Sequence, residues 1–254
     1  MREVGARGLT ESLGTERQSV MRYQGGKSRI ANTLAAKIRE FHPAVTEIWE
    51  PFCGGGAMTL ALAKAGFCVH ASDSHEDLIL MWQALLVGTL DMSSVSEAEY
   101  AVLKKAEPSA RRGFAGFGSS FGGGWFAGFA RHSNGNYDYS QVSRRVFEKL
   151  LSFKAQLDFT LADYTTIPDD VLAYCDPPYI GTKPYKGAST FDHVAFWTWV
   201  KQRSGPTFVS ELAGPEDIEI VWRKQHKSQN ASNSPTTRAT AQIIEREERL
   251  YYKP

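Results

Sequence analysis

The sequence predicts an α/β fold: a Rossmann-like parallel sheet covered by helices and interrupted by an inserted segment. Three observations predict it. Helical and extended patterns alternate from residue 21 onward, a glycine-rich turn joins a strand to a helix at Glu50–Gly56, and the alternation stops near residue 90. It resumes after residue 156. Alternating strands and helices typically form a parallel sheet with helices on its faces.

The individual elements follow from apolar periodicity and from turn residues. Residues 29–41 carry helical spacing at Ile30, Leu34, Ile38 and Phe41, and residues 57–66 form a helix that ends at a glycine. The predicted helices are 29–41, 57–66, 74–88 and 191–202, and the predicted strands are 45–52, 67–73, 157–164, 171–179 and 207–212, with an edge strand at 246–254 and a polar loop at 227–242.

Length and composition indicate one domain of ordinary soluble character. The chain has 254 residues, 42% apolar and 22% charged, and no apolar run approaches the roughly 18 residues of a membrane span. The three cysteines are odd in number and widely spaced, which argues against a disulfide framework and favours a reducing, cytoplasmic location. The six histidines show no metal-ligand spacing, so no metal is expected. We expect residues 1–20 to form a flexible polar tail.

The charge distribution separates the inserted segment from the rest. Between Lys104 and Lys154 there are nine lysine and arginine residues against three acidic residues, so the remaining chain is net acidic. A basic segment on a mildly acidic body favours a dedicated surface for an anionic polymer. We therefore expect residues 91–155 to be a recognition region inserted between residues 21–90 and 156–254.

The glycine turn and a later acid point to a nucleoside cofactor. Glycines in Glu50–Gly56 allow backbone to approach a ligand closely and expose N–H groups at a helix start. Asp73 ends the next strand, nineteen residues after Gly54, where an acid typically holds a ribose diol. The alternative is a packing turn and a helix-terminal acid. The spacing is not the dinucleotide GxGxxG pattern, and the turn has no phosphate-neutralising cation, so S-adenosylmethionine (SAM) is favoured over NAD.

Lys27 follows the tight turn Gly25–Gly26 at a predicted helix start, where a cation opposes the helix dipole. An anionic partner, such as the carboxylate of SAM, would explain it; an exposed lysine beside a solvated turn is the alternative.

The segment Phe117–His132 interleaves aromatic and small residues. Such a pattern suits a surface that stacks bases and neutralises phosphates, and it equally suits a glycine-rich hydrophobic core. The candidate DNA-binding residues in and around it are Arg111, Arg112, Trp125, Arg131, Asn134, Asn136, Arg144 and Arg145.

The sequence CDPPYIG, residues 175–181, follows the apolar run VLAYC. Two prolines end a strand abruptly, because proline cannot donate to a sheet ladder, and they leave Asp176 at the strand tip. Asp176 and the carbonyl of Pro177 are placed to accept hydrogen bonds from a planar NH2 group, with Tyr179 stacked on its ring. Pro178 stiffens the turn. A purely structural turn is the other interpretation.

In order along the chain, the segments RYQGGK, EPFCGGG, ASDSHEDLI, DY at 163–164, YCDPPY and FVSE resemble the Dam-type DNA adenine-N6 methyltransferases, in a phage-like variant. The resemblance covers most of residues 21–215. It implies a Rossmann-like SAM-dependent methyltransferase sheet with an inserted target-recognition subdomain. The family's first-motif tryptophan is Tyr23 here, and the glycine-rich insertion does not carry over a GATC target.

The resemblance also implies site roles. Asp163 is expected near the adenine of SAM, Asp73 at its ribose, and Tyr23 and Lys27 beside it. The full expected cofactor set is Tyr23, Lys27, Glu50, Phe52, Gly54, Gly56, Asp73, Asp163 and Asp176, and the catalytic set is Asp176, Pro177, Pro178 and Tyr179.

The predicted function is therefore methyl transfer from SAM to the N6 amine of a flipped adenine in double-stranded DNA, by a monomer, in a phage or restriction-modification setting. N4-cytosine, RNA or protein-amide methylation and a non-catalytic DNA-binding regulator remain open alternatives.

Overall fold

A computed structural model describes residues 23, 25–131, 144, 147–180, 191–229 and 243–254. The predicted N-terminal tail and the candidate DNA-binding residues Asn134, Asn136 and Arg145 lie outside this part of the chain.

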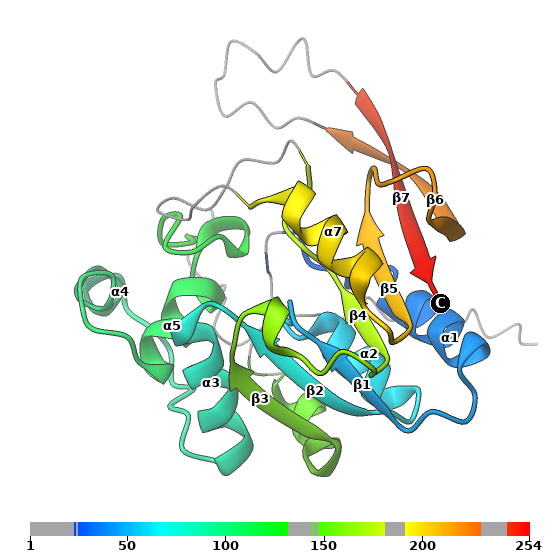
Figure 1. The fold of residues 1–254 in the computed structure, drawn as a ribbon. Coiled ribbons are helices and arrows are strands. Elements are labelled where there is room, and N and C mark those ends of the chain that lie inside the picture. The colour runs from blue at the N-terminus through cyan, green and yellow to red at the C-terminus, as the bar shows by residue number, and fades with distance from the viewer. Residues whose placement is uncertain (1–22, 24, 132–143, 145–146, 181–190, 230–242) are drawn as a thin grey trace, which may run out of the picture.

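A seven-stranded sheet forms the centre of the described structure (Figure 1). Its order is β3-β2-β1-β4-β5-β7-β6; the first five strands are parallel and β7 runs antiparallel to both of its neighbours. The strands are β1 (Glu47–Glu50), β2 (Cys68–Asp73), β3 (Leu157–Leu161), β4 (Ala173–Cys175), β5 (Thr207–Glu211), β6 (Glu219–Gln229) and β7 (Ile243–Lys253). The 3-2-1-4-5 order is that of a Rossmann-like sheet, so the predicted fold class is confirmed.

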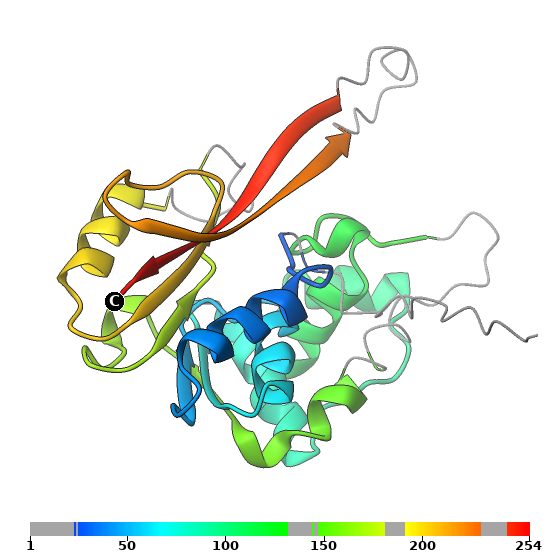
Figure 2. The same ribbon diagram turned by 90° about the vertical axis from the view of Figure 1, so that its right-hand side faces the viewer.

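The C-terminal strand differs from its prediction in position. We expected the last residues to form an edge strand, but β7 pairs with β5 on one side and β6 on the other, so β6 is the edge. Sequence periodicity indicates that a segment is extended and does not indicate which neighbours it pairs with. Residues 227–229 of the predicted polar loop belong to β6, and the rest of that predicted loop lies outside the described residues. In Figures 1 and 2, β6 and β7 continue beyond the other strands as a two-stranded ribbon.

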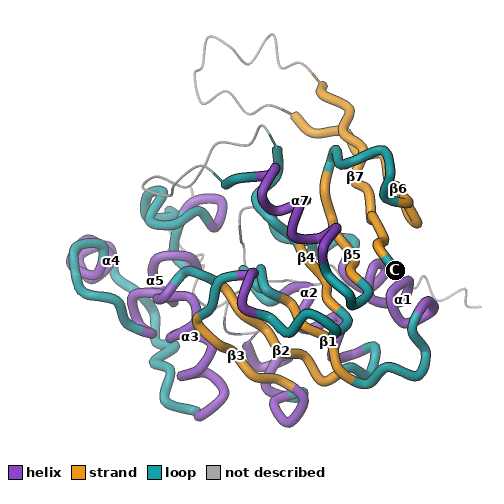
Figure 3. Tube along the Cα trace, viewed as in Figure 1, coloured by secondary structure: helices purple, strands orange, loops and turns teal. Residues whose placement is uncertain are grey.

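Helices cover both faces of the sheet. Figure 2 shows α7 on one face and α1 and α2 on the other, and Figure 3 shows the strands as one continuous layer between them. The described helices include α1 (Ala31–Phe41), α2 (Ala57–Lys64), α3 (Glu76–Val87), α4 (Glu97–Leu103), α5 (Ala110–Gly118) and α7 (His193–Gln202), with single 3₁₀ turns at Phe121–Gly123, Lys154–Gln156 and Tyr164–Thr166.

Alternation along the strands distributes side chains to two hydrophobic clusters. Tyr174 and Phe208 belong to the larger cluster with α1, α2 and α3, whereas Cys175 and Val209 pack against α7. Successive strand residues point to opposite faces, so each parallel strand is apolar on both sides. Cys175 is fully buried, which fits a small strand residue and not a reactive thiol.

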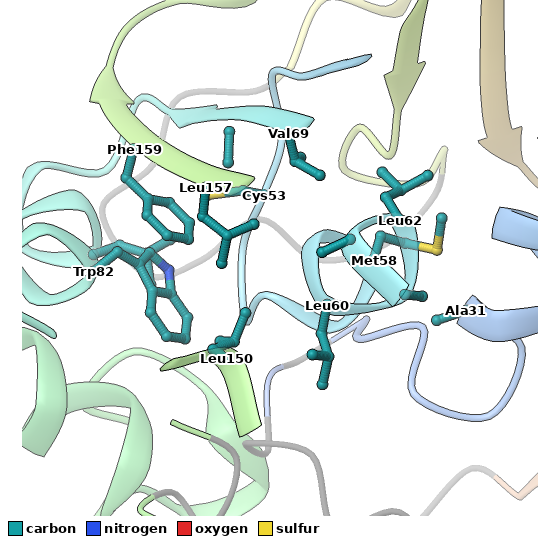
Figure 4. Close-up of a cluster of buried hydrophobic side chains, with 14 of the residues drawn as sticks. Ala31, Cys53, Met58, Leu60, Leu62, Val69, Trp82, Leu150, Leu157 and Phe159 are labelled. Atoms are coloured by element: carbon teal, nitrogen blue, oxygen red, sulfur yellow. The ribbon is translucent and has the colours of Figure 1, made fainter. Parts of the chain in front are cut away.

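Trp82 joins this core to the glycine turn. Its ring stacks on Phe159 with centroids 5.4 Å apart (Figure 4). Its indole N–H donates to the carbonyl of Gly54 at 3.1 Å. The buried face of α3 therefore fixes the position of the turn that follows β1.

The first part of the inserted region shares the same core. Gly113 of α5 lies so close to α3 that a Cβ there would come within 2.2 Å of the carbonyl oxygen of Asp77. Phe114, Phe117 and Phe126 are buried in the larger cluster, whereas Phe121 is 67% exposed. Most of the aromatic residues described in this segment thus supply a hydrophobic core.

Candidate active site

The acidic residues predicted from the motifs lie at one edge of the sheet. Glu50 and Asp73 end β1 and β2, and Asp176 directly follows β4. These strands are parallel, so their carboxyl ends lie on the same side, which is where open α/β sheets bind ligands.

Tyr23 packs directly on the glycine turn. A Cβ on Gly55 would lie 2.6 Å from the Cβ of Tyr23, and one on Gly54 would lie 2.8 Å from its ring. Gly54 has a φ of +45°, which disfavours other residues. The glycines therefore let the Tyr23 ring approach the backbone, and Tyr23 helps to shape the site at the start of the described chain.

Asp73 organises the same turn through both carboxylate oxygens. Oδ2 accepts a hydrogen bond from the Gly54 N–H at 3.1 Å, and Oδ1 accepts one from the His75 N–H at 3.0 Å. Burial raises the pKa of Asp73, and these backbone donors oppose the rise. Each oxygen keeps further acceptor capacity, which suits two adjacent hydroxyl groups.

Glu50 is a buried acid next to this turn. It is 1% exposed and bonded to the Thr59 hydroxyl at 2.6 Å, and burial raises its pKa well above the ordinary value. Burial therefore favours the neutral form of the Glu50 carboxyl more than it would for a solvent-exposed glutamate, and the hydrogen bond from Thr59 opposes this.

Phe52 and Asp163 extend the site toward α7. The Phe52 ring stacks on Tyr164 with centroids 5.5 Å apart. Asp163 is exposed at the end of the segment after β3, and its Oδ1 accepts from the Thr165 N–H at 3.0 Å and hydroxyl at 2.7 Å. Asp163 lies beside the end of β2, because the next residue toward β3, Ala162, donates its N–H to the Asp73 carbonyl at 3.2 Å.

The DPPY turn meets Lys27 across 149 residues of sequence. Lys27 Nζ lies 2.5 Å from Asp176 Oδ1, and its ammonium group also contacts the hydroxyl of Tyr179 and sits 4.2 Å from that ring's centroid. The lysine is only 5% exposed. The anionic partner expected for Lys27 is thus supplied, in this structure, by the protein's own carboxylates.

Two acids that the motif reasoning did not single out complete the site. Glu248 of β7 is 5% exposed, accepts a hydrogen bond from the Tyr179 hydroxyl and lies 3.5 Å from Lys27 Nζ. Glu211 ends β5, is fully buried, and accepts from the N–H groups of Leu212, at 2.8 Å, and of Ile180. Glu248 could have been found from the sequence ERLYY, because alternation along a strand places it on the same face as the apolar residue Leu250, which is buried.

The titration of Asp176 reflects these neighbours. Burial raises the pKa of Asp176 to about 6, Lys27 opposes the rise, and the charge of Glu248 adds to it. Burial likewise raises the pKa of Glu211 to about 7. Near neutral pH the Asp176 carboxylate is mostly ionised and able to accept hydrogen bonds from an amine.

The candidate DNA-binding arginines that the structure describes make contacts within the protein. Arg111 bonds to Glu99 at 2.8 Å, and Arg112 pairs with Asp77 at 2.5 Å and lies 4.9 Å from the centroid of the Trp125 ring. Arg131 is 70% exposed and pairs with Glu97. Arg144 donates to the carbonyl of Met92 at 2.6 Å.

Trp125 itself packs against Phe117 and His75, with ring centroids 4.7 and 4.3 Å apart. The only strongly exposed guanidinium group among these described candidates is that of Arg131.

Among the described residues there is no group of side chains that could hold a metal ion, and none of the helices found there is long and apolar enough to cross a membrane.

Comparison with known families identifies the chemistry. Residues 23–122 match the family of D12 class N6 adenine-specific DNA methyltransferases, which confirms the predicted resemblance. The chain is a methyltransferase. The matched segment contains Tyr23, Lys27, the glycine turn and Asp73, together with α4 and α5.

Comparisons with solved structures return methyltransferases at low similarity, and a comparison with curated proteins finds no match. A protein of Pyrococcus horikoshii, inferred to be an RNA methyltransferase, is 10% identical, with a TM-score of 0.42 and 87% and 81% of the two chains covered. An inferred Escherichia coli methyltransferase is 9% identical, with a TM-score of 0.39 and coverage of 92% and 90%.

S-adenosylmethionine is the methyl donor of this chain, as predicted. The residues at the carboxyl edge fit it, because Asp73 offers two acceptors beside the glycine turn and His75 contributes a buried Nδ1 without a hydrogen-bond partner. The sulfonium of SAM supplies an activated methyl group; the protein has to bind, orient and deprotonate the acceptor.

Proposed function

We propose that this chain transfers a methyl group from SAM to the N6 amine of adenine in double-stranded DNA. The observation that carries the proposal is the match of residues 23–122 to the adenine-specific DNA family. The position of Asp176, at the sheet edge that also holds Asp73, supports it, because donor and acceptor sites then share one edge.

The acceptor amine needs orientation more than activation by a base. Its lone pair is delocalised into the ring, so it is a poor nucleophile in free solution. In the proposed mechanism Asp176 and the Pro177 carbonyl each accept one N–H, which aims the nitrogen at the methyl group. A hydrogen bond to a carboxylate contributes roughly 1.5–3 kcal/mol.

Rigidity of the turn serves the same end. Pro177 and Pro178 restrict the backbone on either side, and Tyr179 provides the stacking surface under the base. The methyl group would pass directly and in line from the sulfur of SAM, which leaves as S-adenosylhomocysteine, to the amine nitrogen, with no covalent bond to the enzyme. The methylated nitrogen would then release one proton to Asp176 or to water. An adenine in a duplex reaches this turn only if it flips out, which costs a few kcal/mol of unstacking.

We further propose that residues 91–155 serve target recognition, whereas residues 21–90 and 156–254 form the catalytic domain of a monomer. The excess of cations between Lys104 and Lys154 supports this division. A phage or restriction-modification setting belongs to the same proposal, through the family resemblance.

The test is nucleoside mass spectrometry of DNA incubated with the protein and SAM. N6-methyladenine is expected, and N4-methylcytosine as the sole product would refute the adenine assignment. Asp176→Ala should abolish transfer while SAM and DNA binding persist. Asp170→Ala, at an exposed acid on the loop before β4, is the matched control and should remain active. Unchanged activity of Asp176→Ala would refute the mechanism.

A non-catalytic DNA-binding regulator is the second candidate. The exposed, basic side chain of Arg131 is compatible with a DNA-binding role. It predicts DNA binding without methylated product from the wild-type chain, so the same assay separates the two.

A further inference from the structure

Lys27 donates a hydrogen bond to the same carboxylate, Asp176, that the proposed substrate amine needs as an acceptor. Asp176 Oδ1 is engaged by Lys27 Nζ at 2.5 Å, whereas the proposed mechanism requires Asp176 to accept a hydrogen bond from the incoming amine. A carboxylate can accept several hydrogen bonds, so the amine binds Asp176 alongside Lys27, and sharing the acceptor weakens the hold of Asp176 on Lys27. A buried ammonium without a carboxylate partner is strongly disfavoured, so Lys27 needs a second acceptor.

We propose that Glu248 is a positioning residue that takes over Lys27 when the substrate amine binds Asp176, and that it holds the Tyr179 ring in place through its hydroxyl. This inference rests on the proposed function. It assigns Glu248 no contact with the substrate; Glu248 acts through Lys27 and Tyr179.

The strand register brings Glu248 to the site. β7 pairs with β5 through Arg249 and Glu211 at the carboxyl end of β5, and Glu248 is the next residue of β7 beyond this pair. Glu248 shares a face with Leu250, which is fully buried in the larger core, so its side chain points toward that face and not toward α7. A residue far along the sequence thus lies beside both Lys27 and the DPPY turn.

The distances allow the Lys27 ammonium group to move from Asp176 to Glu248. Lys27 Nζ is 2.5 Å from Asp176 and 3.5 Å from Glu248, and the side chains of Lys27 and Glu248 are 4% and 7% exposed. A small rotation of the flexible lysine side chain shifts its hydrogen bond from one carboxylate to the other without exposing the ammonium group. The ammonium remains in the site throughout and offsets the charge of two buried acids.

Tyr179 is held by the same pair. Its hydroxyl donates to Glu248 and accepts from Lys27, and Lys27 Nζ lies over its ring at 4.2 Å from the centroid. Two contacts at the hydroxyl fix the position of the outer end of the ring. If the ring stacks on the target base, loss of Glu248 lowers the rate by misplacing the base as well as by trapping Lys27 on Asp176.

Several charged or titratable groups act on Asp176, and a test that uses pH has to consider all of them. They are Lys27 before α1, Glu50 on β1, Tyr174 and Cys175 on β4, Tyr179 in the turn, Glu211 on β5 and Glu248 on β7. Lys27 lowers the pKa of Asp176 and the charge of Glu248 raises it. Removal of the Glu248 charge should therefore lower the pKa of Asp176.

The experiment compares Glu248→Gln with Glu247→Gln. Glu247 is the adjacent acid on β7, pairs with Arg249 at 2.6 Å and lies on the opposite face of the strand, so its substitution removes the same charge outside the site. Both variants are assayed for kcat from pH 5 to pH 9, for SAM affinity and for thermal unfolding. Because ionised Asp176 is required, the wild-type kcat should fall as the pH drops through about 6.

Glu248→Gln should lower kcat at neutral pH by roughly tenfold or more, while SAM affinity stays within about threefold of wild type. The acid limb of its pH profile should move to lower pH, because the charge that raised the pKa of Asp176 is gone. Glu247→Gln should match the wild type in both respects. A purely structural role of Glu248 would change stability and leave kcat above the acid limb at the wild-type level.

Tyr179→Phe provides a second variant, which is assayed alone and in combination with Glu248→Gln. It removes the hydroxyl that links the ring to Glu248, so the loss caused by Glu248→Gln in this background should be smaller than in the wild type. Wild-type kcat and an unshifted limb in Glu248→Gln, or fully multiplicative losses in the double variant, would overturn the inference. If the wild type methylates DNA and the variants give those results, only the role of Glu248 is overturned. If the wild type does not methylate DNA, the proposed function is overturned as well.

Discussion

Arg112 was a candidate for DNA binding, and the structure places it in an ion pair with Asp77. The variant Arg112→Met tests whether its main role is structural. The guanidinium group of Arg112 donates to Asp77 Oδ2 at 2.5 Å and to the carbonyl of Leu103 at 2.9 Å. The side chains of Arg112 and Asp77 are 16% and 5% exposed. Removal of the arginine leaves a buried carboxylate whose remaining described partner is the Ser109 N–H at 2.8 Å.

The expected magnitude follows from this burial. Breaking a buried ion pair by removing one partner costs about 3–5 kcal/mol. A domain typically has about 5–15 kcal/mol of stability in total, so Arg112→Met should lose a large share of it. Arg131→Met is the control: it breaks a pair whose arginine is 70% exposed, and such surface pairs contribute about 0–1 kcal/mol.

The assay is urea unfolding followed by circular dichroism, with the free energy of unfolding extrapolated to water. Asp77→Asn in the Arg112→Met background should recover part of the loss, because it removes the unpaired charge and keeps an acceptor for Ser109. A loss below about 1 kcal/mol for Arg112→Met would refute the structural role. If weakened DNA binding with a shallower salt dependence accompanied that result, Arg112 would be a phosphate contact after all.

Two further outcomes are expected. Gly55→Ala should destabilise the protein by about 1–3 kcal/mol, measured by urea unfolding, because the added Cβ would lie 2.6 Å from that of Tyr23; a stability equal to that of the wild type would contradict this clash. Ellman's reagent should modify Cys68 rapidly in the native protein, and the buried Cys53 and Cys175 only after denaturation; a fast reaction of Cys175 would contradict its burial at the sheet.

Local patterns predicted much of the active site because its parts are themselves local. An apolar run followed by two prolines places Asp176 at a strand tip, whatever the neighbouring strands are. The glycine turn and Asp73 lie at the ends of consecutive parallel strands, and such ends meet at one edge of a sheet. The sequence predicted each of Glu50, Asp73 and Asp176 near the end of a strand, and the parallel pairing of β2, β1 and β4 brings these ends to one edge.

Charge and aromatic content were less informative about the inserted region. Arg111, Arg112 and Trp125 were candidates for DNA contact, and the structure gives each of them partners within the protein. A segment rich in basic and aromatic residues can form either a surface that binds DNA phosphates or a hydrophobic core flanked by ion pairs. Which of the two forms depends on acids such as Asp77 and Glu99, which lie on other helices.

The sequence by itself determined the alternating α/β fold, the acid at the tip of β4, the cofactor edge and the family resemblance. Only the tertiary structure decided that Lys27 meets Asp176 across 149 residues, that β7 lies inside the sheet, and that Glu248 reaches the site from β7. The physical reason is that periodicity and turn chemistry act between neighbours in the chain. The pairing of a buried charge is set by whichever distant strand folding places beside it.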